Sequence, residues 1–214
     1  MFQAMKKNGG ILALFALLAT GLVAITHLLT EGRIAKQQEI ELMDILNQVV
    51  PAHSHDNVLY KSCTLVKDLP RLGTNDAEPA YIATKDGKPV GIAIQAIAPD
   101  GYSGAIKLIV GLNMDGVVTG VRVLQQNETP GLGNKIETSV SNWIYSFNGK
   151  KVKGENDPAW HVRKDGGEFD QFTGATITPR AVVKSVKNVS LFWDQIKTKS
   201  LASHLIVQES NNVN

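Results

Sequence analysis

The chain of 214 residues contains a single cysteine, Cys63, so an internal disulfide framework is excluded and we expect a small, partly buried apolar side chain there. Net charge is nearly absent as well, because 22 lysines and arginines are balanced by 20 aspartates and glutamates. A formal charge of +2 provides no broad basic surface for nucleic acid. Both surplus positive charges, Lys6 and Lys7, precede residue 30 in a stretch without acidic residues. The remainder is therefore a neutral body behind a basic N-terminal tip.

The common catalytic signatures are also missing. The sequence contains no GxxxxGK[ST], HExxH, CxxC or GxSxG motif, so a P-loop, a zinc protease, a dithiol redox site and a serine hydrolase all lack support. The segment Gly131–Gly133 resembles the start of a dinucleotide fingerprint, but Ile136 stands where the third glycine belongs. It also follows predicted hairpins instead of opening a βαβ unit, which excludes a Rossmann site.

The longest apolar run, residues 11–29, has the sequence ILALFALLATGLVAITHLL and no full charge. An α-helix of that length spans about 28 Å at roughly 1.5 Å per residue, which matches the ~30 Å hydrocarbon core of a bilayer. We therefore predict one transmembrane helix over residues 11–29. A cleaved signal peptide is the alternative, but the run exceeds the usual apolar region of about 7–15 residues and no convincing A-x-A site follows it.

The charges that flank this run predict its orientation. Lys6 and Lys7 precede it, whereas Arg33 and Lys36 behind it are offset by acidic residues. Because an excess of lysine and arginine is retained in the cytoplasm, residues 1–10 are predicted to be a cytoplasmic tip. The body behind the helix is then exported.

Residues 30–79 are predicted to connect the helix to the body. Apolar residues recur at helical spacing from Glu31 to Val50, so the transmembrane helix continues as an amphipathic stalk. Pro51 ends it. The residues beyond form an irregular lead-in with one strand near residues 58–66.

Two hairpins dominate the next part of the chain. Asp86–Gly87 and Asp115–Gly116 each separate two runs rich in β-branched residues, which is the strongest short hairpin signal in a sequence. We therefore predict four strands of a mainly antiparallel sheet, with one buried face supplied by Ile106, Leu108 and Val110. The fold class is α+β: a single N-terminal transmembrane helix followed by a mainly antiparallel sheet of hairpins with packed helices.

Two helices are expected to pack on this sheet. The first is predicted from a stripe at helical spacing: Ile136, Val140, Trp143, Ile144 and Phe147. The second begins with Thr178 as its N-cap and Pro179 as its first residue, and it extends to Lys199. The exported domain thus covers residues 80–200, and residues 201–214 are a polar tail.

The segment DQFTGATITP, residues 170–179, is the most informative for function. Thr173, Gly174 and Ala175 are small enough for a ligand to approach the backbone closely. Thr176 lies two residues before the expected N-cap, where unpaired N–H groups and the helix dipole favour a phosphate group. These residues alone leave two interpretations open, a phosphate-binding site or an ordinary turn and helix cap.

A resemblance to a known family separates these interpretations. DQFTGAT matches the D-x-x-[S/T]-G-A-[T/S] pattern of proteins that carry flavin mononucleotide (FMN) on the final Thr or Ser through a phosphoester. Residues 101–135 also resemble the body of that family's FMN-binding domain. The chain is similar throughout to G subunits of the Rnf (or Rsx) ion-translocating electron-transport complex. The C subunits of the sodium-translocating NADH:quinone reductases are close relatives, and they are usually longer.

Carried over by position, Thr176 would be the acceptor whose hydroxyl is esterified by the phosphate of one FMN. Asp170 would be recognised by a separate, magnesium-dependent flavin transferase that uses FAD as donor. The resemblance implies cofactor-binding residues in the TGAT turn and in an ETPGLG loop: Thr173, Gly174, Ala175, Glu128, Thr129, Pro130, Gly131, Leu132 and Gly133. No catalytic acid or base and no metal ligand is implied.

The resemblance implies a membrane-anchored protein that relays electrons within an ion-coupled redox complex of the bacterial inner membrane, with its C-terminal domain in the periplasm. Its partners would be the other subunits of the complex and the transferase, and it would turn over no substrate alone. One alternative is an exported, membrane-anchored sensor or assembly module without covalent flavin. Another is a free-standing flavin reductase, but the sequence has no NAD(P)H fingerprint.

Overall fold

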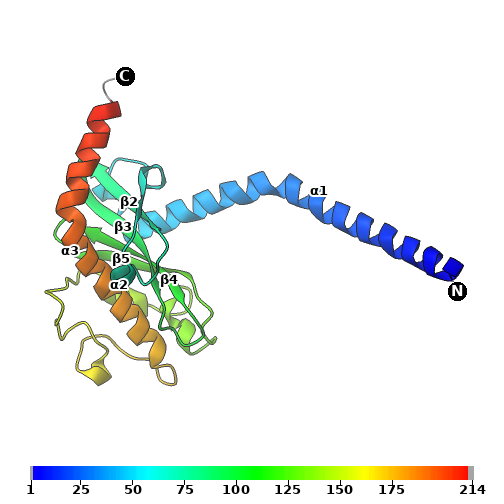
Figure 1. Ribbon diagram of the computed structural model, residues 1–214. Helices are drawn as coiled ribbons and strands as arrows, with labels where there is room; N and C mark the ends of the chain where they lie inside the picture. Colours follow the sequence, from blue (N-terminus) through cyan, green and yellow to red (C-terminus); the bar gives the residue numbers. More distant parts are fainter. Residues whose placement is uncertain (1, 212–214) are drawn as a thin grey trace. The chain divides into compact units, whose positions relative to one another are not determined.

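The computed structural model describes the backbone of residues 2–211 and the side chains of residues 6–34 and 36–197. Residue 1 of the expected tip and residues 212–214 of the expected tail lie outside this part. The chain divides into two compact units between Leu42 and Met43. Figure 1 shows the helix α1, Phe2–Val49, and the domain that follows it.

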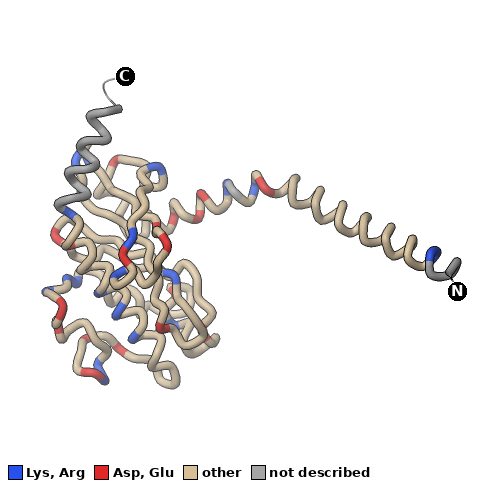
Figure 2. Tube along the Cα trace, in the orientation of Figure 1, with Lys and Arg blue, Asp and Glu red and all other residues tan. Residues whose placement is uncertain are grey.

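The first unit is the N-terminal part of α1. This helix is long and apolar enough to cross a membrane, and its candidate span lies within Lys6–Val49. Figure 2 shows a long stretch of α1 without charged residues between the lysines near the N-terminus and the first acidic residue. Leucines such as Leu17 and Leu29 are largely exposed. An exposed apolar surface of this length is what contact with lipid tails requires.

The second unit is built on a five-stranded antiparallel sheet with the strand order β1-β2-β3-β4-β5. Its strands are β1 Cys63–Val66, β2 Glu78–Lys85, β3 Lys88–Ala98, β4 Ile106–Asn113 and β5 Val118–Gln125. Both predicted hairpins are confirmed. In the first, Asp86 and Gly87 have φ of 52° and 73°, as a two-residue turn that matches the twist of its strands requires. In the second, Asn113 Oδ1 accepts hydrogen bonds from the N–H groups of Asp115 and Val117.

The lead-in contributes β1, which the sequence placed only roughly. Two short 3-10 helices, η1 Ala52–Ser54 and η2 Leu59–Ser62, precede it, so the strand occupies only the second half of the predicted range. The expectation for Cys63 was wrong, because this residue is exposed on the edge strand β1.

One face of the sheet packs against the long C-terminal helix α3, Ile177–Asn211. As predicted, Ile106, Leu108 and Val110 are fully buried there. The helix contributes an apolar face to the same core: Val182, Val186, Val189 and Trp193. Figure 1 shows α3 running along one side of the sheet. The helix continues twelve residues past the predicted end at Lys199, to Asn211.

Two glycines accommodate the last turn of α1 against β4 and β5. Gly111 and Gly120 are partners in the register, and a Cβ atom on Gly111 would lie 2.1 Å from the carbonyl oxygen of Val49. Thr119 is the extra residue of a β-bulge beside this pair, and its hydroxyl donates to the same oxygen at 2.5 Å. Arg122 Nε donates to Gln48 Oε1 at 2.7 Å. The end of α1 is therefore fixed to the sheet by direct bonds.

The helix predicted from the stripe Ile136 to Phe147 does not form. The structure has instead two 3-10 helices, η3 Gly133–Ile136 and η4 Trp143–Phe147. The hydroxyl of Ser141 donates to Lys135 O at 2.6 Å and accepts from Trp143 N at 3.1 Å. This side chain thus takes up backbone groups that a continuous helix would pair internally.

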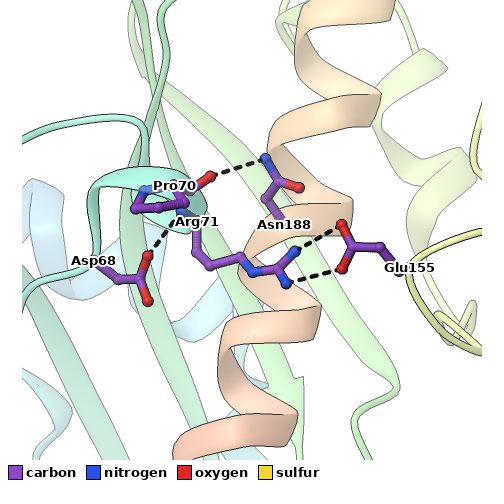
Figure 3. Close-up of polar contacts among 5 residues, drawn as sticks. All are labelled: Asp68, Pro70, Arg71, Glu155 and Asn188. Atoms are coloured by element: carbon purple, nitrogen blue, oxygen red, sulfur yellow. Dashed lines mark hydrogen bonds and ion pairs between the residues drawn. The ribbon is translucent and has the colours of Figure 1, made fainter.

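The long loop between η4 and α3 contains Glu155 and the 3-10 helix η5, Arg163–Asp165. It is attached to the short helix α2, Leu69–Leu72 (Figure 3). Asp68 caps α2 by accepting from Arg71 N at 3.0 Å. The Arg71 guanidinium donates to both carboxylate oxygens of Glu155, at 2.8 and 3.2 Å. Asn188 of α3 donates to Pro70 O. Trp160 is buried in this loop.

Candidate cofactor site

The ETPGLG loop and the TGAT turn, far apart in the sequence, line one cavity of about 400 Å³. Seven of the expected residues line it: Glu128, Thr129, Leu132, Gly133, Gly174, Ala175 and Thr176. Pro130, Gly131, Thr173 and Asp170 do not. Sequence reasoning missed two lining residues, Tyr102 and Ile177. A volume of this size lies within the range of about 300–1,000 Å³ that is usual for cofactor and ligand sites.

The ETPGLG loop is a compact turn held by its own backbone. The carbonyl oxygen of Thr129 accepts from the N–H groups of Leu132 and Gly133, both at 3.1 Å. Gly131 has φ of 77°, which favours glycine, and its N–H donates to the side chain of Asn134 at 2.7 Å. The loop is therefore preformed without a ligand.

Glu128 is the buried centre of the site, with 4% of its surface exposed. One carboxylate oxygen accepts from Ser103 N at 3.1 Å, and the other accepts from the hydroxyl of Thr178 at 2.5 Å. A Cβ atom on Gly133 would lie 2.6 Å from this second oxygen. Gly133 is thus required by the packing of Glu128. The carboxylate ties together three chain segments that line the cavity.

The TGAT turn is closed by a hydrogen bond from Ala175 N to Phe172 O at 3.2 Å, and Gly174 has φ of 80°. The Phe172 ring packs edge-on against Trp143, with 5.1 Å between ring centroids. Trp143 Nε1 also donates to Asp170 O at 2.7 Å. Trp143, expected only as part of a helical stripe, therefore holds both ends of the DQF segment.

The start of α3 differs from the prediction at one important point. The helix begins at Ile177, so Thr176 occupies the N-cap position. Thr178 is the second helical residue and Pro179 the third, and the Thr178 hydroxyl binds Glu128 instead of capping the helix. Within the described part of the chain, no hydrogen bond uses the hydroxyl of Thr176. The structure thus leaves this hydroxyl free at the cavity wall, beside the first N–H groups of α3.

The charged residues around the start of α3 already have partners. Arg180 donates to both carboxylate oxygens of Asp165, at 2.6 and 2.8 Å. This pair lowers the pKa of Asp165 and raises the pKa of Arg180. Asp170 is exposed and pairs with Arg163 at 3.1 Å. The Arg180 guanidinium also lies 3.5 Å from Thr176 O, and the backbone N–H groups that open α3 lie beside the same residue.

Comparison with known proteins gives consistent matches over most of the chain. Residues 101–190 match the family model of the FMN-binding domain, and residues 1–49 match that of the RnfG N-terminal region. The G subunit of the ion-translocating oxidoreductase complex of Vibrio atlanticus is 58% identical over 96% of this chain and 98% of its own length. The corresponding protein of Shewanella oneidensis is also 58% identical, over 91% of this chain and 92% of its own.

A solved structure is similar at lower identity. The crystal structure of Shewanella oneidensis NqrC aligns with a TM-score of 0.45 at 20% identity, over 69% of this chain and 73% of that one.

Proposed function

Because this chain belongs to the family of G subunits of ion-translocating oxidoreductase complexes, we propose that it carries one FMN covalently on Thr176 and relays electrons between other subunits of such a complex. The relatives and the match to the RnfG N-terminal region confirm the expected family. The covalent linkage and the relay role are the proposal.

The observation that carries the proposal is the free Thr176 hydroxyl at the wall of the cavity. Two features support it as the attachment point. The hydroxyl lies beside the N–H groups of Ile177 and Thr178, which open α3 and can bind a phosphate group. Its neighbour Thr178 is excluded as acceptor, because its hydroxyl is buried on Glu128.

The attachment transfers the FMN group of FAD to the hydroxyl oxygen of Thr176. The Thr176 oxygen forms a bond to the FMN phosphorus of FAD, the pyrophosphate bond breaks, and AMP leaves with the displaced oxygen. The hydroxyl proton is released. A flavin transferase with Mg²⁺ performs this step, and the exposed Asp170 is available for its recognition. The remaining wall of the pocket is supplied by Thr129, Leu132 and Gly133.

A covalent bond suits an exported electron carrier. A micromolar site corresponds to about 8 kcal/mol of binding free energy, and a cofactor held so would dissociate on dilution outside the cytoplasm. The ester prevents this loss. When bound, FMN supplies the one- and two-electron chemistry, while the protein supplies orientation and surroundings.

The anchor determines where this relay works. Lys6 and Lys7 lie before the apolar stretch of α1, so we propose an inner-membrane protein with a cytoplasmic N-terminus and a periplasmic domain. One helix cannot enclose an ion path, so ion translocation belongs to partner subunits. A reductase acting alone is disfavoured, since the chain has no NAD(P)H fingerprint.

Intact mass and in-gel flavin fluorescence test the attachment in the full chain coexpressed with a flavin transferase. We expect the denatured wild type to gain one FMN less one water and Thr176→Ala to gain nothing. Thr138→Ala is the matched control, because it removes an exposed hydroxyl that does not line the cavity and should retain the mass gain. Covalent flavin on Thr176→Ala would refute the assignment. Absence of any gain in the wild type with an active transferase would favour the sensor or assembly module.

A further inference from the structure

Tyr102 is the one aromatic residue among the described residues that line the cavity. We propose that its ring stacks on the isoalloxazine ring of the FMN carried by Thr176 and lowers the reduction potential of that flavin. This inference rests on the proposed function, because it requires flavin in the cavity. Neither the sequence motifs nor the family matches assign this residue a role.

The exposure of Tyr102 is the first argument. Tyr102 is 68% exposed, whereas Tyr81 is only 5% exposed. Tyr145 is also partly exposed, but its ring lies 4.6 Å from the guanidinium carbon of Arg122. For Tyr102, no ring or cation contact occurs within the described part of the chain. A large aromatic surface left free at a cavity is available to stack on a ligand.

The backbone on either side of Tyr102 is fixed, which is the second argument. A Cβ atom on Gly101 would lie 2.1 Å from Gly104 O, so the two glycines form a tight turn. On the other side of Tyr102, Ser103 N donates to the buried Glu128 carboxylate at 3.1 Å. Asp100 pairs with Lys184 of α3 at 2.5 Å. The ring is therefore carried by a loop that is attached to Glu128 of the cavity wall and to α3.

The other lining residues match a flat, conjugated ring. Leu132 and Ile177 come from two different segments, and 40% and 45% of their surfaces are exposed. Glu128 is the one ionisable group besides Tyr102 among the lining residues that the structure describes, and both of its oxygens already accept hydrogen bonds. The cavity thus offers apolar edges, one aromatic surface and the Thr176 hydroxyl as a tether.

Stacking has two measurable consequences. An electron-rich phenol ring in contact with an excited flavin quenches its fluorescence by electron transfer. It also interacts more favourably with the electron-poor oxidised flavin than with the electron-rich reduced flavin, which lowers the reduction potential. The shift in potential depends on the stacked aromatic ring, whereas the quenching also requires the phenol oxygen, because a phenyl ring alone is a poor electron donor.

The test uses the full chain, coexpressed with a flavin transferase and purified in detergent, as wild type, Tyr102→Leu and Tyr102→Phe. Tyr145→Leu is the matched control, because it removes an exposed tyrosine that does not line the cavity. Flavin content is measured by intact mass, fluorescence is measured per attached flavin, and the potential is measured by anaerobic redox titration.

We expect all four proteins to carry FMN. Tyr102→Leu should show severalfold stronger fluorescence and a higher potential. Tyr102→Phe should share the stronger fluorescence but keep a potential near that of the wild type, and Tyr145→Leu should resemble the wild type in both. A folded Tyr102→Leu that lacks flavin beside a labelled Tyr102→Phe would also support a role for the ring.

Three other results would overturn the inference. The first is a flavin-loaded Tyr102→Leu with the fluorescence and potential of the wild type. The second is an equal change of the potential in Tyr102→Phe, or an equal change of either quantity in Tyr145→Leu. A wild type without flavin would overturn the proposed function itself, and this inference with it, so the two failures are distinguishable.

Discussion

Two glutamates fasten segments of the same domain in opposite surroundings. Glu128 is 4% exposed and accepts from two neutral donors, Ser103 N and the Thr178 hydroxyl. The side chain of Glu155 is 64% exposed and forms a two-bond ion pair with Arg71. Both connect parts of the chain that are distant in sequence. Only the first does so at the wall of the cavity.

The difference shows that burial, and not formal charge, decides which bond matters for the site. Water can replace either partner of an exposed ion pair, so such pairs add little to stability. A buried donor that loses its acceptor has no such replacement. We therefore expect the cavity to depend on Glu128 and the α2 attachment to tolerate the loss of Glu155.

The largest effect should come from removal of the buried carboxylate of Glu128. Glu128→Ala leaves Ser103 N and the Thr178 hydroxyl without acceptors, which we expect to lower the free energy of unfolding by about 1–3 kcal/mol for each group. Urea unfolding monitored by tryptophan fluorescence measures the change. Glu155→Ala is the control and should leave the midpoint nearly unchanged, even though Arg71 lowers the pKa of the Glu155 carboxyl. Equal losses in the two variants would contradict the comparison.

A smaller effect should measure the contribution of one hydrogen bond, that from the Thr178 hydroxyl to Glu128. Glu128→Gln keeps the shape of the side chain, and Thr178→Val removes the hydroxyl at similar volume. A double-mutant cycle should give a coupling of about 1 kcal/mol between the two positions, because they share a hydrogen bond. The same cycle between Glu128 and Thr129, whose side chain lacks this bond, serves as control. Additive effects of Glu128→Gln and Thr178→Val would show that the bond contributes nothing.

The smallest effect concerns acid stability in the loop that Glu155 fastens. Asp157 accepts from Lys153 N at 2.9 Å and Ala159 N at 3.1 Å, and these bonds hold the pKa of its carboxyl below the usual value. Its stabilisation is therefore complete above the pKa of the unfolded chain and is lost as the pH falls through the lower, folded-state pKa. We expect Asp157→Asn to flatten the acid side of a plot of melting temperature against pH. An unchanged slope would contradict the prediction.

Local signals explain the parts of the fold that were predicted correctly. The hairpin at Asp86–Gly87 follows from residues that tolerate positive φ between β-branched runs. The burial of Ile106, Leu108 and Val110 follows from their alternation along β4, but Ile109 on the opposite face is buried as well. The stripe from Ile136 to Phe147 failed as a helix because the side chain of Ser141 competes for backbone groups. The spacing of apolar residues in the sequence carries no information about such competition.

The sequence motifs identified Thr176 and the ETPGLG loop as candidate site segments. They did not reveal what brings the two segments to one cavity. The resemblance implied that Gly133 binds the cofactor, and the structure shows that the Glu128 side chain fills the space where a Cβ atom of this residue would lie. Tyr102 and Ile177 carried no motif. Thr178 looked like a helix cap, and its role became visible only through its bond to Glu128.

The sequence by itself determined the apolar anchor, the two hairpins and a threonine before the last helix, because each depends on residues close together in the chain. Only the tertiary structure decided that the ETPGLG loop and the TGAT turn share one cavity, that Glu128 holds its walls together, and that Tyr102 opens onto it. Those arrangements depend on hydrogen bonds such as that between Glu128 and Thr178, which are separated by 50 residues. Such partners are chosen by the packing of the whole domain, so no local pattern contains them.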